Sequence, residues 1–343
     1  HQEARRQRQM CIRDSYISII IIMVLGSLYA VRKINIQFNA QDKIEKYIKY
    51  LLIFCSSIAV LTTIGIIFSL IFESFRFFSQ VSLFEFLFST EWYPFIPIRE
   101  GQAAAEGSFG AVPIFAGTFL VMIVAMCVAA PIGLLTAIYL SEYASQKVRK
   151  TVKPLLEILA GIPTIVYGFF AFVTVAPFVK SFGQSIGIDA SPTSALAAGL
   201  VMGVMIIPFI SSLSDDVINS VPQSLREGSL GIGANKAETI KKVILPAALP
   251  GIVGAFLLAI SRAIGETMIV VVAAGTAANL TANPFENVTT VTVQIVVALI
   301  GDQEFDNPRT LSAFALGLVL FVITLSLNVL ALRIVKKYRE RYE

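Results

Sequence analysis

The chain has 343 residues, of which 56% are hydrophobic and only 15% are charged, and its formal net charge is +4. Its mean hydropathy of +0.76 excludes a soluble globular domain, because a water-facing surface needs more charge. His1 is the only histidine, the three cysteines indicate no disulfide framework, and there is no G-x-x-x-x-G-K-[ST] phosphate loop. We therefore expect no enzymatic site, metal or cofactor in this chain, and any ATPase that drives it is a separate subunit.

Residues 1–15 read HQEARRQRQMCIRDS. The stretch MCIRDS is the translation of a transposase end sequence used in DNA library preparation, so we interpret residues 1–15 as a library artefact fused to a truncated gene. A native basic leader is the alternative, although the cleavage-site pattern of a signal peptide is missing. Residues 16–44 are predicted to form a truncated extra span, over the short apolar run 16–31, and a cytoplasmic linker.

Six longer apolar runs are predicted to cross the membrane as helices, because each approaches or exceeds the ~20 residues that span the hydrocarbon layer. They are residues 47–72, 112–140, 154–178, 193–213, 247–275 and 310–335. The run 291–300 is too short to cross, so a re-entrant or interfacial helix is expected there. The sequence thus predicts an all-α polytopic protein with one transmembrane domain over 45–335 and a basic tail at 336–343.

Lysine and arginine set the predicted orientation, because these residues concentrate in cytoplasmic loops. Loops on one side of the predicted spans carry eighteen of them, and loops on the other side carry four. The richer segments are residues 32–50, 141–153, 214–246 and 333–343. We therefore expect a multi-pass protein of the bacterial cytoplasmic (inner) membrane whose C-terminus and long loop 214–246 are cytoplasmic.

An aromatic segment at residues 75–95 lies on the predicted outer side and contains Trp92, the only tryptophan. Aromatic residues gather at the membrane interface, so an aromatic-belt helix is the favoured interpretation. A platform for an extracytoplasmic partner is the alternative.

Proline and glycine interrupt two predicted spans, at Pro131 and at Gly161 with Pro163. Such breaks are tolerated where neighbouring helices or a cavity satisfy the freed carbonyls. Hinge or cavity-lining positions and simple packing kinks are equally consistent with these residues.

Four acidic residues near the predicted cytoplasmic face receive no functional role. Asp215 and Asp216 are expected to form a solvated helix end, since carboxylates are rarely buried without partners. Glu142 and Glu157 are assigned no function.

The loop before the sixth long run reads LREGSLGIGANKAETIKKVILPAALPG at residues 225–251. Gly233 can supply the φ > 0 backbone that a sharp turn between two helices needs. Pro246 then precedes the next span, where its missing N–H costs little. The pattern predicts a compact L-shaped pair of short helices presented to the cytoplasm.

Arg262 and Glu266 are the only charges between Pro246 and Glu286. A charge at the centre of a membrane helix costs ~2.5–3.5 kcal/mol, so stability alone does not explain them. Spacing by four predicts that both project from one helix face. A structural ion pair is one interpretation. The favoured one is a substrate pathway, in which the guanidinium binds an oxyanion and Glu266 either accepts a phosphate O–H or only neutralises Arg262.

The segment RAIGETM, with the loop before it, resembles the signature of phosphate ABC importer permeases. FGAVPIFAGT (109–118), PIGLLTAIYLSEYA (131–144) and LLEILAGIPTIVYGFFAF (155–172) agree, so the resemblance covers roughly residues 45–335. The E-T-M ending and the F-G-A-V-P entry favour the PstC-type subunit over its PstA-type partner. The resemblance implies the type I ABC importer permease fold.

The same resemblance implies roles for particular residues. The spacing matches the family loop E-A-A-x3-G-x9-I-x-L-P, with Gly-Ser in place of Ala-Ala. The residues that this loop would use to dock on the ATPase are Glu227, Gly233, Leu245 and Pro246. In the family the Arg and Glu of the signature are implicated in phosphate passage, and here they are Arg262 and Glu266.

The implied function is import of inorganic phosphate by alternating access. The implied partners are a PstA-type second permease, a dimer of ATPase subunits that binds ATP and Mg, an extracytoplasmic phosphate-binding protein and the lipid bilayer; no nucleic acid is expected. A permease for sulfate or molybdate is an alternative. An ion-coupled carrier or channel, independent of ATP, and a non-transporting scaffold are alternatives from other classes.

Overall fold

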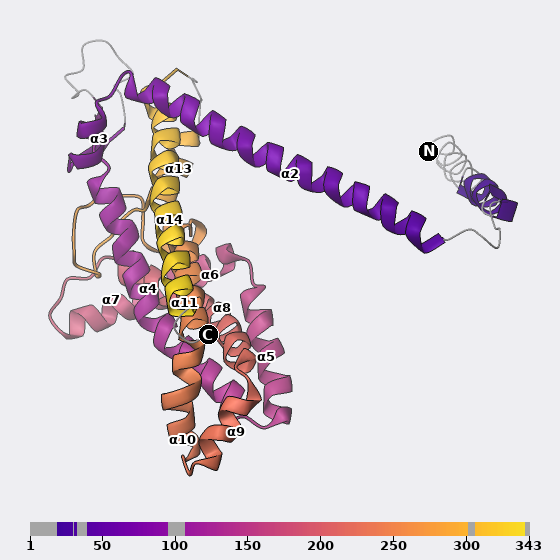
Figure 1. Cartoon of the computed structure of the whole chain (residues 1–343). Coiled ribbons are helices and arrows are strands. Elements are labelled where there is room, and N and C mark those ends of the chain that lie inside the picture. The colour runs from indigo at the N-terminus through magenta and orange to yellow at the C-terminus, as the bar shows by residue number, and fades with distance from the viewer. Residues whose placement is uncertain (1–18, 30, 33–39, 95–106, 301–305, 340–343) are drawn as a thin grey trace, which may run out of the picture. The chain divides into compact units, whose positions relative to one another are not determined.

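The computed structural model describes residues 19–29, 31–32, 40–94, 107–300 and 306–339 (Figure 1). These residues are helical almost throughout, which confirms the predicted all-α class. They divide into two compact units, His1–Ile67 and Phe68–Glu343, which are described separately. The interpretation of residues 1–15 as a library artefact falls outside the described residues.

The first unit contains a short apolar helix, Ile19–Tyr29, and the greater part of α2 (Ala40–Phe78). The stretch Ile44–Phe78 of α2 is long and apolar enough to cross a membrane, and none of its most apolar part is buried inside the protein. Helices tolerate lipid because their backbone hydrogen bonds are satisfied internally, so exposed apolar side chains suit this element. The span predicted at 47–72 is present and extends beyond both predicted ends.

The second unit contains the other helices and a two-stranded antiparallel pair. In chain order the elements are α3 (Leu83–Phe88), β1 (Trp92–Tyr93), β2 (Ser108–Phe109), α4 (Val112–Ile138), η1 (Tyr139–Tyr143, a π-helical turn), α5 (Gln146–Ala160), α6 (Thr164–Phe170), η2 (Ala171–Val175), α7 (Ala176–Ser185), α8 (Ala195–Ser220), α9 (Gln223–Gly231), α10 (Lys236–Thr239), η3 (Ile240–Ile244), α11 (Leu245–Ile264), α12 (Met268–Ala273), α13 (Val291–Leu299) and α14 (Pro308–Arg339).

Six helices of the described chain are long and apolar enough to span a membrane, as the sequence predicts. The boundary at 154–178 is wrong, because α5 ends at Ala160 and the span is Thr164–Ser185. The break lies at Gly161, which closes α5, and at Pro163, which caps α6. Pro163 disfavours helical backbone at the residue before it, so a helix cannot run smoothly through this point. Gly161 and Pro163 therefore separate two elements.

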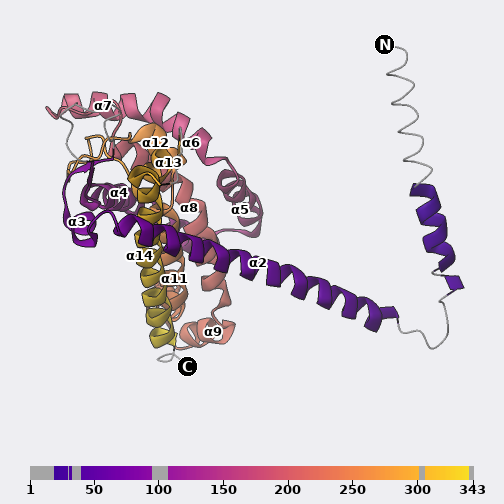
Figure 2. The ribbon, with the colours of Figure 1, turned by 90° about the horizontal axis from the view of Figure 1, so that it is seen from above.

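The helix α8 is the most buried span and lies among α4, α5, α6 and α11 when the molecule is seen from above (Figure 2). Its contact with α4 is close because glycine faces the neighbour. A Cβ on Gly199 would lie 2.5 Å from Val124 Cγ1, and one on Gly203 would lie 2.9 Å from Ala125 O. Small residues allow membrane helices to approach in this way, which van der Waals packing then stabilises.

Pro131 does not break its span, contrary to the prediction. It lies inside α4, which continues to Ile138. Two residues on, a Cβ on Gly133 would lie 2.8 Å from Ile210 Cβ of α8. The Pro131 region is thus a packing site against α8 rather than a helix end.

The aromatic segment 75–95 is only partly an aromatic belt. Phe77, Phe86 and Trp92 are buried in a second core cluster with residues of α14, whereas Phe84 is 76% exposed. Trp92 Nε1 donates to Gln294 Oε1 of α13 at 3.0 Å. The belt interpretation is therefore wrong for Trp92, because its side chain is buried and its indole N–H is hydrogen-bonded within the protein.

The run 291–300 forms the short helix α13, as predicted from its length. Val291 and Val293 are fully buried, and α13 packs against α14. Val296 and Ile300 are 36% and 66% exposed, so one side of α13 is buried in the protein and the other is open, and a re-entrant and an interfacial helix both remain consistent with this segment.

Candidate functional site

The loop between α8 and α11 contains the predicted helix pair. Helices α9 and α10 meet at a turn in which Gly233 has φ +91°. Ser229 Oγ lies 2.9 Å from Thr239 Oγ1, and both side chains are buried between the two helices. Asn235 caps α10 in a reciprocal capping box with Glu238. These bonds hold the two arms of the loop together, so it presents a defined surface.

The second arm of this loop continues directly into a span. Residues Lys236–Ile264 form one continuous helical segment, so Pro246 lies within it and does not precede it as predicted. The π-helical turn η3, Ile240–Ile244, comes immediately before α11, which begins at Leu245. A proline removes a backbone donor and crowds the preceding turn, and a π-bulge accommodates both without ending the helix. Leu245 and Pro246 thus lie inside the helical segment that connects the loop to α11.

The tip of the loop is exposed and partly apolar. Ile232 is 88% exposed and Leu230 is 52% exposed, and Glu227 is exposed on α9 beside them. An exposed apolar cluster with a charge at its edge is typical of a protein contact surface.

A buried ion pair fastens this loop to the spans. Arg226 Nη1 contacts Glu142 Oε1 of η1, and Arg226 Nη2 donates to the Ile218 carbonyl of α8 at 2.7 Å. The side chains of Arg226 and Glu142 are only 14% and 8% exposed. A cavity of about 350 Å³ lies against the pair. One guanidinium therefore joins α9 to the ends of α4 and α8, although sequence reasoning assigned Glu142 no role.

Arg262 and Glu266 do not share a helix face, contrary to the prediction. Helix α11 ends at Ile264 with Gly265 as its cap, so Glu266 lies between α11 and α12. Gly265 breaks a run that hydropathy alone reads as one helix over 247–275. Among the described residues no ion pair joins Arg262 to Glu266, so the structural ion-pair interpretation is not supported.

Glu266 is engaged by the backbone around it. Its Oε1 accepts hydrogen bonds from the N–H groups of Met268 at 3.0 Å and Ile269 at 3.3 Å, at the start of α12. Its carbonyl accepts a bond from Thr292 Oγ1 at 2.8 Å. A carboxylate at a helix N-terminus satisfies free N–H groups and interacts well with the helix dipole. The second carboxylate oxygen has no such bond in the described chain.

Arg262 is exposed at the end of α11. Its guanidinium carbon lies 6.0 Å from the centre of the Phe209 ring of α8. Arginine over an aromatic face retains its in-plane N–H donors, because the ring contacts the flat side of the guanidinium. The geometry leaves the donor fork of Arg262 available to an oxyanion.

A polar network joins α5 to α8. Asp215, with a side chain 2% exposed, lies 2.9 Å from Arg149 Nη2 and 3.1 Å from Lys153 Nζ. Lys153 also bonds Asp216 at 2.9 Å. The hydrogen bond that Lys153 donates to Asp216 is the main reason that the pKa of Lys153 is raised, so Lys153 is cationic. The prediction that Asp215 lies at a solvated helix end is wrong, because it anchors α5.

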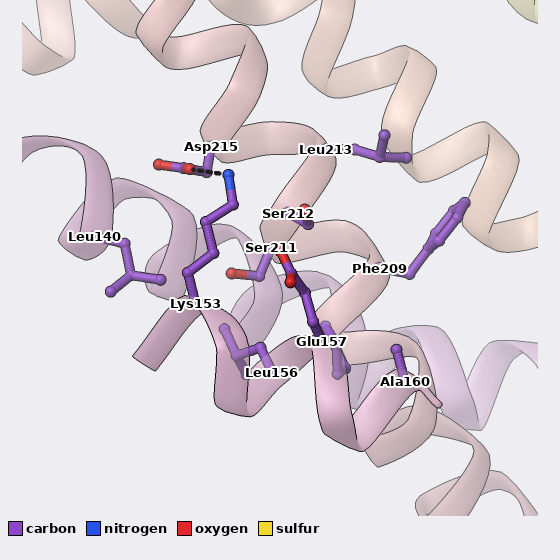
Figure 3. Close-up of a pocket in the computed structure, with 11 residues that line it drawn as sticks. Leu140, Lys153, Leu156, Glu157, Ala160, Phe209, Ser211, Ser212, Leu213 and Asp215 are labelled. Carbon is purple, nitrogen blue, oxygen red and sulfur yellow. Dashed lines mark hydrogen bonds and ion pairs between the residues drawn. The ribbon is translucent and has the colours of Figure 1, made fainter. Parts of the chain in front are cut away.

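A pocket of about 250 Å³ opens beside this network, between α5 and α8 (Figure 3). Phe209 forms part of its wall, so the pocket begins at the ring that Arg262 contacts. Lys153 and Glu157 line it from α5, and Ser211 lines it from α8. Neither the pocket nor Ser211 was predicted, since serines within an apolar run give no distinct signal.

Comparisons with known proteins agree with this architecture. A family model described as "Binding-protein-dependent transport system inner membrane component" matches residues 129–340. The chain is 36% identical over 244 residues to "Probable ABC transporter permease protein YqgH" of Bacillus subtilis (strain 168), covering 71% of this chain and 75% of that protein. It is 34% identical over 291 residues to "Phosphate transport system permease protein PstC" of Pasteurella multocida (strain Pm70), covering 78% and 86%.

A solved structure supports the fold. The "Crystal structure of bacterial alginate ABC transporter in complex with alginate pentasaccharide-bound periplasmic protein" matches with a TM-score of 0.58 at 16% identity, over 87% of this chain and 97% of that chain. The arrangement of spans is thus that of an ABC importer permease. On the family match, the similar permeases and this fold, the chain belongs to the binding-protein-dependent transport system inner membrane components.

Proposed function

We propose that this chain is the PstC-type permease subunit of an ABC importer, and that it passes inorganic phosphate across the bacterial cytoplasmic membrane. The observation that carries the proposal is the exposed Arg262 guanidinium, which contacts Phe209 and has no acidic partner among the described residues. A planar guanidinium binds phosphate oxygens in a bidentate manner. The relatives named "Phosphate transport system permease protein PstC" support phosphate as the substrate.

The proposed orientation places the loop between α8 and α11, and the C-terminus, in the cytoplasm, because lysine and arginine concentrate there. The exposed tip with Glu227 and Ile232 then docks on a separate ATPase subunit, with Gly233 forming the turn. Two such subunits bind ATP and Mg. A PstA-type permease completes the pathway, and an extracytoplasmic binding protein delivers phosphate.

The way the loop between α8 and α11 is attached explains how ATPase closure could be coupled to the substrate site at Arg262. The continuous helical segment Lys236–Ile264 runs from the docking loop to Arg262, so one element connects the loop to the substrate site. Closure of the ATPase dimer would tilt this helix and expose Arg262 to one side of the membrane at a time. No covalent step is required of this chain.

The test is phosphate uptake by cells that carry the complete system. Arg262→Gln removes the charged fork, and hydrogen bonds to charged groups contribute ~1.5–3 kcal/mol, so uptake should fall about 10-fold to 100-fold. Arg333→Gln, an exposed arginine on α14, is the matched control and should transport normally. Assembly with the other subunits is checked by co-purification. Wild-type uptake by an assembled Arg262→Gln complex would contradict the proposal.

A second measurement separates the rival substrates and classes. Labelled phosphate uptake is measured with excess sulfate or molybdate, and neither should compete. Uptake should also require the ATPase subunit, and Glu227→Ala should weaken ATPase co-purification. Transport by this chain alone, without ATP, would favour an ion-coupled carrier or channel.

A further inference from the structure

We propose that the pocket between α5 and α8 is a second binding site for protonated phosphate, which receives the ion after Arg262. The inference rests on the proposed function and extends it from one phosphate contact to two. The pocket has a volume of about 250 Å³, and Figure 3 shows Glu157 of α5 pointing toward Ser211 of α8 while the Lys153 ammonium reaches Asp215.

The side chain of Ser211 is the strongest sign of a ligand. The residue is 1% exposed, it lines the pocket, and its Oγ has no hydrogen-bond partner in the part of the chain that the structure describes. A buried hydroxyl without a partner costs ~1–3 kcal/mol, and native proteins rarely leave one unsatisfied. An oxyanion in the pocket would accept a hydrogen bond from the Ser211 hydroxyl and remove this cost.

The other polar groups match phosphate that still carries a proton. Lys153 has three N–H donors and uses two on Asp215 and Asp216, so one is left for the pocket. Ser212 adds a second hydroxyl. Glu157, an exposed carboxylate at the wall, can accept a P–O–H proton. Sulfate at neutral pH has no such proton, so Glu157 would repel it.

The charge balance indicates a weak site. The positive charges of Arg149 and Lys153 are matched by Asp215 and Asp216, which leaves Glu157 as the uncompensated charge. The monobasic ion, which carries the smaller charge and two P–O–H groups, is therefore the favoured ligand. A conducting pathway needs sites that bind enough to admit an ion and weakly enough to release it.

The position fits a sequence of two sites. Phe209 contacts the Arg262 guanidinium and also lines the pocket, so one ring separates the two sites. From Arg262 the ion would pass the Phe209 edge to Ser211, along α8 toward the loop end of the bundle. The apolar remainder of the wall strengthens each hydrogen bond by lowering the local dielectric.

The test reads occupancy of the pocket directly. The reporter thiol is Leu213→Cys, which lines the pocket without being one of the proposed phosphate-binding groups. It is introduced into the assembled complex after Cys11, Cys55 and Cys127 of this chain are replaced by serine, and the rate of its modification by a charged thiosulfonate is measured in membrane vesicles. Millimolar inorganic phosphate should slow modification at least 3-fold, and sulfate should not. Thr151→Cys, exposed on α5 and outside the pocket lining, is the control and should be unaffected. If Leu213→Cys fails to assemble, Ala160→Cys, which lines the pocket from α5, replaces it.

Two further variants connect protection to the proposed groups. Adding Ser211→Ala should raise the phosphate concentration for half-protection about 10-fold, the usual effect of one lost hydrogen bond. Adding Glu157→Gln should let sulfate protect as well. No protection by phosphate, equal protection by sulfate in the parent, or no effect of Ser211→Ala would each overturn the inference. The uptake assay keeps the proposals distinct: transport without protection rejects only the second site, whereas absence of phosphate transport rejects the proposed function.

Discussion

The buried pair of Arg226 and Glu142 makes a quantitative prediction about the docking loop. Glu142→Gln removes the carboxylate and leaves the Arg226 guanidinium 14% exposed with a neutral neighbour. Breaking a buried ion pair from one side costs ~3–5 kcal/mol, because the remaining charge stays desolvated. The bond to the Ile218 carbonyl at 2.7 Å persists. The expected loss of stability is therefore about 3 kcal/mol, the lower end of that range.

Thermal unfolding of the detergent-solubilised chain gives the measurement. Trp92, the only tryptophan, is 9% exposed in a core cluster remote from the pair, so its fluorescence reports overall unfolding. All variants are compared at one scan rate, since membrane proteins commonly unfold irreversibly. The double variant Glu142→Gln with Arg226→Met should lose less than the sum of the single losses, because it leaves no buried charge unpaired.

An exposed pair on the same loop is the matched control. Lys242 Nζ lies 3.5 Å from Glu238 Oε1, and the two side chains are 72% and 44% exposed. Such pairs contribute ~0–1 kcal/mol, so Lys242→Met should change the unfolding temperature little. If Glu142→Gln is no more destabilising than Lys242→Met, or if the double variant shows additive losses, the burial argument is refuted.

Three other outcomes are expected. Asp215→Asn leaves two cations of α5 without their shared carboxylate and should cost about 2–3 kcal/mol in the same assay, less than the upper limit for buried pairs because those cations are about one-third exposed. The contribution of Lys153 to the free energy of unfolding should be constant from neutral to mildly alkaline pH. A group whose pKa is raised in the folded state stabilises the protein fully below its ordinary pKa of 10.5, and this stabilisation is lost only as the pH rises through the folded-state pKa. Unfolding temperatures at several pH values check this. Gly117→Ala should cost about 1–3 kcal/mol or prevent folding, because a Cβ there would lie 2.2 Å from the Thr289 carbonyl oxygen; expression and unfolding temperature test this.

The spans could be predicted because lipid imposes length and hydropathy on each crossing helix. The breaks within apolar runs could not, because hydropathy does not report backbone conformation. The run 247–275 is uniformly apolar apart from two charges, yet Gly265 ends α11 and Thr267 precedes α12. A spacing of four places two residues on one face only within a single helix, so the prediction that Arg262 and Glu266 share a face is wrong.

The polar contacts of the site could not be predicted from local sequence patterns, because they join residues that are far apart in the sequence. Helical spacing relates residues three or four apart, whereas Arg226 and Glu142 are 84 positions apart and Arg149 and Asp215 are 66 apart. Such pairs are fixed by how spans pack, which one sequence does not specify. Gly233 was predictable because its role is local, a turn that requires φ > 0.

The capping bonds of Glu266 allow its two proposed roles to be separated. Only Oε1 is used by the Met268 and Ile269 N–H groups, so the proposed role in accepting a phosphate O–H falls to Oε2. Glu266→Gln retains an oxygen acceptor for the cap and loses the charge, so the unfolding temperature should hold while phosphate uptake falls about 10-fold. Glu266→Ala loses the cap as well and should also cost ~0.5–2 kcal/mol of stability. Normal uptake by Glu266→Gln would show that the carboxylate charge serves neither the phosphate proton nor Arg262, and that its role is to cap α12.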